Sequence, residues 1–523
     1  MNKSDLITIN DAVVWASEYT KKSVTISNIS YLIQYALIDK VINNGVAYIS
    51  QSDLKKYYDK NKKEINWKEK LGNDLNWKLS FDNLKESDTT KHVHRIHPYK
   101  GKFIPQLVNY FIDNSIDEFK KEVYFKKDDI ILDPFCGSGT TLVQANELGI
   151  NALGIDISNF NTIISNSKIS YIDLGKLEII LKELTEKLEN YIKINSEFEN
   201  ELNEKLFDFN NKYFDKVMFK KYVRENKIDS KIYGKEKEKE FLIEYYNLIK
   251  KYNIRLKNDD DSSFIKKWFI PSIIDELNFM NDLIKNIDDK NIKNIIMVIL
   301  SRTMRSCRAT THSDLGTLLN PVVTTYYCRK HYKICKPLFS IIKWWKIYYK
   351  DTIKRLHIFN NLRTDTKQLC ITGDSRNIDI FSVLKNIDYN FYELLNNRKI
   401  NGIFTSPPYI GLIDYHEQHA YAYDLFDFNR NDNFEIGSLS KGTSLNAKKE
   451  YTEDISKVLL NAKKYMTDDY NVFIVANDKY NLYPEIAYKS NMKIVNTFKR
   501  PVLNRVEKDK SAYSEIIFHL KEL

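Results

Sequence analysis

Residues 128–158 constrain the fold more than any other part of this sequence. Two short apolar runs, DIILDPF and NALGIDIS, enclose a glycine-containing turn and a helical segment, TTLVQANELG. Strand, turn, helix and strand in this order predict a βαβ unit of a parallel sheet. Gly137 and Gly139 let the backbone approach a ligand closely, and the helix that starts after Thr140 offers free N–H groups. We therefore expect an α/β fold with a ligand site at this helix start.

The turn differs from two common phosphate-binding motifs. It lacks the Gly-Lys-Ser/Thr ending of a P-loop, and it is not a plain GxGxxG dinucleotide turn. Asp156 ends the second apolar run. A carboxylate at this edge of the sheet can accept hydrogen bonds from both hydroxyls of a ribose, which predicts a nucleoside cofactor. The alternative is that Asp156 only caps the helix that follows it.

A second constraint comes from the stretch NGIFTSPPY at residues 401–409. Adjacent prolines cannot continue a β-ladder because each lacks an N–H, so the strand must stop at Ser406. A stiff loop then follows the end of a strand, which is where α/β sheets bind ligands.

The sequence as a whole predicts five segments. In residues 1–60, Thr8 and Asp11 can cap a first helix, a second helix follows a polar break, Asn-Gly predicts a hairpin, and a last helix closes the unit. This order is similar to that of winged helix-turn-helix modules of the excisionase and MerR type, and a purely structural or protein-contact domain is the alternative. Residues 61–90 predict a polar connector. Residues 91–174 and 366–523 have the α/β pattern, so one sheet is interrupted by a long helical insertion at residues 175–365.

Composition suggests the partner and the compartment. The 80 basic and 70 acidic residues give a net charge of +10, which suits a polyanionic partner, although a lysine-rich solvated surface explains the charge equally well. Five cysteines in a long chain favour a reducing compartment over a disulfide framework. There is no signal-peptide pattern and no long apolar run. We expect a soluble, cytoplasmic protein.

Five motifs together resemble the S-adenosylmethionine-dependent DNA amino-methyltransferases. DPFCGSGTT is similar to their cofactor loop, GIDIS to their acidic strand and TSPPY to their catalytic motif, while HPYKGKFIPQL and ITGDS are similar to segments beside the methionine tail and the adenine. The resemblance implies S-adenosylmethionine as cofactor and a Rossmann-like seven-stranded mixed sheet. The cofactor-binding residues that it implies are Tyr99, Lys102, Pro105, Asp133, Phe135, Gly137, Ser138, Gly139, Thr140, Asp156 and Asp374.

The same resemblance implies how the TSPPY loop acts. The hydroxyl of Ser406 and the carbonyl of Pro407 would accept hydrogen bonds from the target amine, Pro408 would keep that carbonyl fixed, and Tyr409 would stack on a flipped base. Serine at the first position favours N4 of cytosine, because N6-adenine enzymes of the family usually have Asp or Asn there. N6 of adenine is the alternative. A C5-cytosine enzyme is not expected, because Cys136 lies in the cofactor loop and is interpreted as a packing residue.

Expected partners follow from this interpretation. Double-stranded DNA is the predicted substrate, with a restriction endonuclease, if there is one, on a separate chain. Arg305 and Arg308, in a stretch where basic and aromatic residues alternate, and Arg500 and Arg505, between the last two strands, are the predicted DNA contacts. Two alternatives stay open: an RNA amino-methyltransferase, and a catalytically silent DNA-binding regulator.

Metal binding is left open by the sequence. Cys328, His331 and Cys335, with Cys307 and His312 upstream, have side chains that ligate zinc. Their spacing lacks a paired CxxC, so no metal site is assigned from the sequence.

Overall fold

The computed structural model describes residues 5–20, 23–34, 38–43, 46–60, 63–193, 196–215, 218–312, 318–503 and 512–523. The chain divides into two compact units, which are described separately. Residues 1–88, 475–479 and 496–518 form the first, and residues 89–474, 480–495 and 519–523 form the second. Within the described residues, no helix has an apolar stretch that could cross a membrane.

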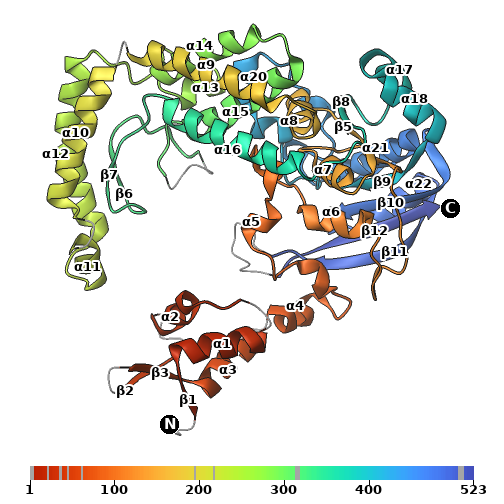
Figure 1. The fold of residues 1–523 in the computed structure, drawn as a ribbon, viewed down its shortest axis with the longest axis horizontal. Helices are drawn as coiled ribbons and strands as arrows, with labels where there is room; N and C mark the ends of the chain where they lie inside the picture. The colour runs from red at the N-terminus through yellow and green to blue at the C-terminus, as the bar shows by residue number, and fades with distance from the viewer. Residues whose placement is uncertain are drawn as a thin grey trace. The chain divides into compact units, whose positions relative to one another are not determined.

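The N-terminal part of the first unit has its own apolar core. Its elements are β1 (Leu6–Thr8), α1 (Ile9–Thr20), α2 (Ile26–Gln34), β2 (Lys40–Asn43), β3 (Val46–Ser50) and α3 (Gln51–Lys60), with β3 between the other two strands (Figure 1). Thr8 caps α1 as the sequence predicts, since its hydroxyl accepts a hydrogen bond from the backbone N–H of Asp11 at 3.2 Å. The predicted Asn-Gly turn lies outside the described residues, but the strands on either side of it pair antiparallel. The sequence pattern missed β1.

The connector after this module contains α4 (Lys63–Leu71), a short 3-10 helix (Trp77–Ser80) and α5 (Glu86–Thr89). Its two tryptophans, Trp67 and Trp77, pack edge to face with ring centroids 6.1 Å apart. The backbone N–H of Asn76 donates to the carbonyl of Lys499 at 2.7 Å. The connector is therefore anchored to other parts of the chain.

The sheet has seven strands, as predicted, in the order β11-β12-β10-β9-β4-β5-β8. Numbered one to seven along the chain, and read from the β8 edge, this order is 3-2-1-4-5-7-6, so its first five positions follow the Rossmann arrangement. The strands are β4 (Ile130–Asp133), β5 (Asn151–Asp156), β8 (Gln368–Thr372), β9 (Ile400–Thr405), β10 (Met466–Ala476), β11 (Met492–Pro501) and β12 (Ser514–Glu522). β4 pairs parallel with both β5 and β9. The order of the strands reverses at β4, so the carboxyl ends of β4 and β9 flank the crevice where such sheets bind ligands.

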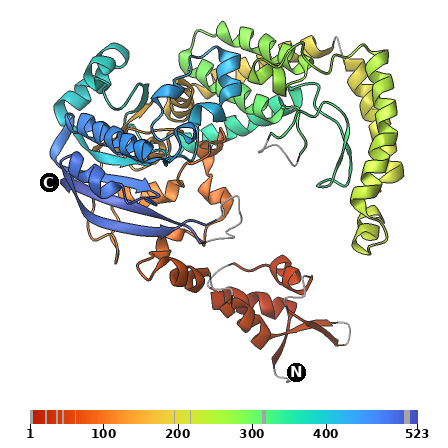
Figure 2. The same ribbon diagram turned by 180° about the vertical axis from the view of Figure 1, so that it is seen from behind.

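Helices cover the faces of the sheet, which explains why β4 is buried along its whole length (Figures 1 and 2). The short helices near the site are a 3-10 turn (His92–Arg95), α19 (Tyr415–Gln418), α20 (Ala420–Phe426) and the 3-10 turns Asp432–Phe434 and Leu439–Lys441. The longer ones are α6 (Pro105–Ile112), α7 (Thr140–Glu147), α8 (Asn159–Ile169), α17 (Ile380–Ile387), α18 (Tyr389–Arg398), α21 (Leu445–Lys463) and α22 (Tyr483–Lys489).

The insertion between β5 and β8 is mostly helical, as predicted. It contains α9 (Leu174–Ile192), α10 (Ser196–Tyr213), α11 (Met218–Arg224), α12 (Ser230–Lys251), α13 (Phe264–Trp268), α14 (Pro271–Lys285), α15 (Lys290–Ser306) and α16 (Ile342–Asn360). Helix α15 packs against α8 of the sheet layer, and α16 packs against α15 and α9. The structure adds a hairpin that the sequence pattern missed, β6 (Tyr326–Cys328) with β7 (Lys333–Cys335).

Candidate active site

A cavity opens at the carboxyl edge of the sheet, where β4, β5, β8 and β9 end. Its open space, including solvent at the mouth, is about 840 Å³. Among the residues predicted from the sequence, those lining the cavity are Tyr99, Lys102, Phe135, Gly137, Ser138, Thr140, Asp156, Asp374, Ser406 and Pro408. Five predicted residues do not line it: Pro105, Asp133, Gly139, Pro407 and Tyr409. The cavity therefore combines segments that are more than 200 positions apart in the sequence.

The glycine loop adopts backbone conformations that favour glycine. Gly137 has φ +50° and Gly139, which precedes α7, has φ +73°. A Cβ atom at Gly137 would lie 2.9 Å from the hydroxyl oxygen of Tyr99, so a larger residue would push into the cavity wall. Cys136 is buried, and burial raises the pKa of its thiol. That fits the packing role predicted for this cysteine rather than a nucleophile.

Asp156 holds the glycine loop in place. One carboxylate oxygen accepts from the backbone N–H of Gly137 at 2.7 Å, and the other accepts from the N–H of Ser158 at 2.8 Å and the amide of Asn161 at 3.1 Å. The cap of α8 is Ser158, so Asp156 is not merely a helix cap. A carboxylate has about four acceptor positions, and three are used here. At least one position therefore stays open to a ribose hydroxyl, and the prediction that Asp156 binds the ribose stays a prediction.

Asp133 joins the cofactor loop to the strand that leads into TSPPY. Its carboxylate accepts a 2.6 Å hydrogen bond from the hydroxyl of Thr405 at the end of β9. Burial raises the pKa of Asp133 to about 6. A second link runs from the hydroxyl of Thr141 to the carbonyl of Phe404 at 3.3 Å. Asp133 thus positions the two loops instead of lining the cavity.

The TSPPY loop is held rigidly after β9. The carbonyl of Pro408 accepts a 2.9 Å hydrogen bond from the hydroxyl of Tyr451, which lies 3.0 Å from the hydroxyl of Tyr483. Within the described part of the chain, neither the Ser406 hydroxyl nor the Pro407 carbonyl has a hydrogen-bond partner. Both groups can therefore accept hydrogen bonds from a ligand, and their role towards the target amine stays a prediction.

The segment before α6 forms one wall of the cavity. The hydroxyl of Tyr99 accepts from the amide of Asn161 at 3.2 Å, and the ammonium of Lys102 donates to the carbonyl of His94 at 2.6 Å. Burial, with Arg95 and Arg355 nearby, lowers the pKa of Lys102 to about 8. Lys102 is therefore a half-buried cation at the cavity wall. Pro105 instead begins α6 and has a structural role there.

Asp374 reaches the cavity with its carboxylate already paired. Arg376 contacts both oxygens of Asp374, at distances from 2.6 to 3.0 Å, and also pairs with Asp454 at 2.6 Å. The expectation that Asp374 lies beside the adenine is compatible with this position. Its charge, however, is balanced by Arg376.

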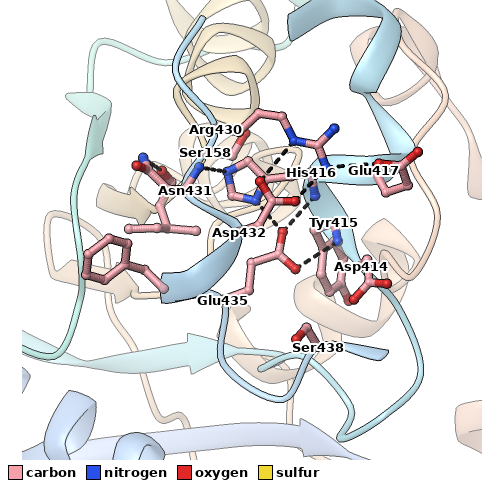
Figure 3. Close-up of polar contacts among 12 residues, drawn as sticks. Ser158, Asp414, Tyr415, His416, Glu417, Arg430, Asn431, Asp432, Glu435 and Ser438 are labelled. Atoms are coloured by element: carbon pink, nitrogen blue, oxygen red, sulfur yellow. Dashed lines mark hydrogen bonds and ion pairs between the residues drawn. The ribbon is translucent and has the colours of Figure 1, made fainter. Parts of the chain in front are cut away.

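Another wall of the cavity comes from residues 415–436, which the sequence analysis missed. Glu435 and Tyr415 both line the cavity. The Glu435 carboxylate accepts from the backbone N–H groups of Tyr415 at 3.1 Å and His416 at 2.7 Å, and it also contacts the His416 ring (Figure 3). The other ring nitrogen of His416 accepts from the N–H of Asn431 at 3.2 Å. Nothing in the spacing of these residues marked them, because the network exists only after the loop folds back.

Of the four arginines predicted to contact DNA, the three that the structure describes differ in their exposure to solvent. Arg305 and Arg308 are half-buried at the end of α15, and Arg308 donates to the Arg305 carbonyl at 2.9 Å. The sequence predicts Arg500 in a loop, but the structure places it in β11, 4% exposed and 3.5 Å from Glu515. We therefore withdraw Arg500 as a DNA contact. Arg505 lies outside the described residues.

Comparison with known proteins gives one match over nearly the whole chain. The type II methyltransferase M.MjaII of Methanocaldococcus jannaschii is 47% identical over 527 residues, covering 99% of this chain and 97% of the relative. M.MvaI of Kocuria varians is 35% identical over 126 residues, 24% of this chain and 26% of its own. M.BsoBI of Geobacillus stearothermophilus is 38% identical over 103 residues, 19% of each chain. A family model described as DNA methylase matches residues 2–166.

The residues of the cavity fit S-adenosylmethionine. Gly137 leaves open a position that a Cβ would fill, and the hydroxyl of Ser138 is buried with no hydrogen-bond partner among the residues that the structure describes. Asp156 keeps an acceptor position for a ribose hydroxyl, and Lys102 can pair with the cofactor's carboxylate. The ribose and the carboxylate of the cofactor thus each have a possible partner in the wall.

We predict that Gly137→Ala lowers the affinity for S-adenosylmethionine roughly tenfold or more, about 1.4 kcal/mol, because the new methyl group would press on Tyr99 in the cavity wall. Gly149→Ala is the matched control. Gly149 also has positive φ, but its Cβ would meet only the flexible side chain of Lys127. Isothermal titration calorimetry measures both variants. Equal affinities for the two would contradict the cradle assigned to Gly137.

The affinity for S-adenosylmethionine should also depend on the protonation of Lys102. Below its pKa of about 8 the ammonium is charged and attracts the carboxylate, and above it the amine is neutral. The association constant should therefore fall as the pH rises through 8.

Two variants separate this effect from titration of the ligand's own amino group. Lys102→Arg keeps a positive charge and should lose the component of the pH profile that belongs to Lys102. Lys102→Met should bind more weakly at pH 7 and converge with the wild type near pH 9.5. Calorimetry across this range gives the profiles, and identical profiles for wild type and Lys102→Met would exclude the assigned contact.

Proposed function

This chain belongs to the type II DNA methyltransferases of the N6/N4 family, and from that premise we propose that it methylates the exocyclic N4 of cytosine in double-stranded DNA. The observation that carries the proposal is the meeting of two loops in one cavity. The glycine loop after β4 and Ser406 and Pro408 after β9 line the same space. The Asp133–Thr405 hydrogen bond holds the two loops together.

The chemistry requires an amine whose lone pair faces an electrophilic carbon. Bound S-adenosylmethionine supplies a methyl group on a positively charged sulfur, and sulfur keeps the electron pair when the methyl group leaves. Exocyclic base amines are weak nucleophiles because their lone pair is delocalised into the ring. The role we assign to Ser406 and Pro407 is to accept the two amine hydrogens and turn the lone pair towards the methyl group.

Rigidity makes these two acceptors effective. An acceptor that reorients during the reaction contributes little, whereas one fixed beforehand stabilises the charge that develops on nitrogen. Two adjacent prolines stiffen the loop, and Tyr451 holds the Pro408 carbonyl. As the N–C bond forms, the nitrogen gives up one proton, which leaves through the hydrogen bond to Ser406 and passes to water. No covalent enzyme intermediate is needed.

Cytosine is favoured over adenine by Ser406. In members of this family with Asp or Asn at that position, adenine N6 is the usual target. Serine at this position therefore supports N4 of cytosine.

DNA contacts are proposed for two regions. Residues 175–365 are proposed to read the target sequence, with Arg305 and Arg308 meeting phosphates. Within the described residues, Arg305 pairs with no acidic side chain, which leaves its charge available. Residues 1–60 are proposed as an additional DNA-binding module. The relatives carry the type II methyltransferase name, so we propose that a cognate endonuclease is a separate chain.

The base assignment is tested by the methylated product. The protein should transfer label from methyl-labelled S-adenosylmethionine to unmethylated genomic DNA, and mass spectrometry of the digested nucleosides should show N4-methyldeoxycytidine. N6-methyldeoxyadenosine would overturn the assignment of cytosine while keeping the enzyme class. Label in RNA alone would overturn the DNA substrate.

Two loop variants test the roles of Ser406 and Tyr409. Ser406→Ala should lower the rate of methyl transfer roughly 100-fold, since loss of one preorganised partner of the transition state has about that effect. Tyr409→Ala should weaken productive DNA binding roughly tenfold or more, because stacking contributes about 1–3 kcal/mol per base. Both variants should bind S-adenosylmethionine like the wild type. Tyr488→Ala, at a tyrosine that is 73% exposed, is the matched control. Unchanged turnover in both loop variants would reject this assignment.

A further inference from the structure

Four metal-ligating side chains meet in the insertion, away from the cavity. They are His312, Cys328, His331 and Cys335, and one potential ligand atom from each lies within 4.8 Å of the other three. Cys328 and Cys335 are buried, while His312 and His331 are exposed. Cys307 is buried and is not a member of this group. We propose that these four residues bind one Zn²⁺ ion that stabilises the β6–β7 hairpin.

The hairpin register places both cysteines on one face. Tyr326 pairs with Cys335 and Cys328 pairs with Lys333, so the two cysteines are diagonal neighbours on the same side of the ladder. The residues between them, Tyr327 and Ile334, point to the opposite face because side chains alternate along a strand. The Tyr327 side chain lies against Gly234 of α12. At the strand edges, the Tyr327 N–H donates to Glu238 at 2.8 Å, and the Ile334 backbone exchanges hydrogen bonds with Asn210.

His331 completes one edge of the ligand set. It lies in the turn between the strands, and its Nδ1 atom is 3.6 Å from the sulfur of Cys335. A tetrahedral Zn²⁺, with bonds of about 2.3 Å to sulfur and about 2.0 Å to nitrogen, holds such a pair about 3.5 Å apart. The widest edge of the same tetrahedron, between two sulfurs, is about 3.8 Å. Since no separation exceeds 4.8 Å, shortening the longest of them by about 1 to 1.5 Å would suit this tetrahedron.

His312 is oriented by a neighbour that suits a metal ligand. The hydroxyl of Tyr326 accepts from the backbone N–H of His312 at 3.2 Å and lies 2.7 Å from its Nδ1 atom. In the proposed site, Nδ1–H donates to Tyr326, which leaves the Nε2 lone pair for the metal. Ligating histidines are commonly held in this way through their second nitrogen. The rings of His312 and His331 are close, with centroids 4.4 Å apart.

A bound ion would stabilise a hairpin that is too short to be stable by itself. Each strand has only three residues, and a two-stranded hairpin is marginal in water by itself. Two cysteines and two histidines with no open position form a closed, structural zinc site. The ion would fix the turn at residues 329–332, where Arg329 and Lys330 are exposed.

A second group of possible ligands, His92, His94 and Glu147, does not support a similar inference. The oxygens of Glu147 already accept from Lys91 at 2.6 Å and from Gln144 at 2.7 Å. Lys91 supplies the positive charge that a metal would bring.

The test is the zinc content of the full-length protein, purified under reducing conditions, incubated with Zn²⁺ and desalted. Inductively coupled plasma mass spectrometry should find about one zinc per chain. His331→Ala should lose the ion at the same concentrations, and because His331 is exposed this change should leave the fold intact. His357→Ala, at an exposed histidine outside the group, is the matched control and should retain zinc. Tyr326→Phe should weaken binding about 10- to 100-fold.

Cobalt provides a readout of the ligands themselves. Co²⁺ in the reduced protein should show the visible bands of a tetrahedral thiolate site, absent in Cys328→Ser and in Cys335→Ser. No zinc in the wild type would overturn the proposal, as would zinc retained by His331→Ala. A Cys328–Cys335 disulfide in protein purified under reducing conditions would also overturn it.

Discussion

A buried hydrogen bond between Thr405 and Asp133 connects the two halves of the active site. It joins the end of β9 to the end of β4, so the catalytic loop and the glycine loop start from adjacent, mutually fixed points. In the sequence, 266 residues lie between Asp133, which ends β4, and Ile400, which begins β9. Parallel pairing at the centre of the sheet removes that separation, because parallel strands end at the same edge. The cavity, its glycine cradle and the free acceptors of the TSPPY loop all depend on this junction.

Much of this architecture is predictable from local sequence. Apolar runs with glycine or proline at their ends predicted the strands, and ten of the fifteen predicted cofactor-binding and catalytic residues line the cavity. The prediction failed where a residue's role depends on distant partners. Asp133 looks like a cavity residue from its motif but is turned to Thr405. Arg500 looks like a surface charge but is buried in β11 beside Glu515.

The cavity wall at residues 415–436 and the Cys/His group were hard to predict from the sequence for the same physical reason. Glu435 and His416 come together through a loop that folds back on itself. His312 contacts Tyr326 of the β6–β7 hairpin, which lies 14 positions further along the chain. Neither distance is set by a helical or strand period, so the local sequence gave no sign of the wall and did not show which of the Cys and His residues lie together. Hairpin register and loop closure decide such contacts, and these emerge only in three dimensions.

The central claim is that the cofactor's reactive end faces Ser406. A crystal structure of the protein with S-adenosylmethionine, or with a non-reactive analogue, measures this most directly. We predict that the ligand fills the cavity between Gly137 and Ser406, with its ribose at Asp156 and the sulfur directed towards the Ser406 hydroxyl and the Pro407 carbonyl. Density for the ligand elsewhere, or with the sulfur directed away from this loop, would contradict the account.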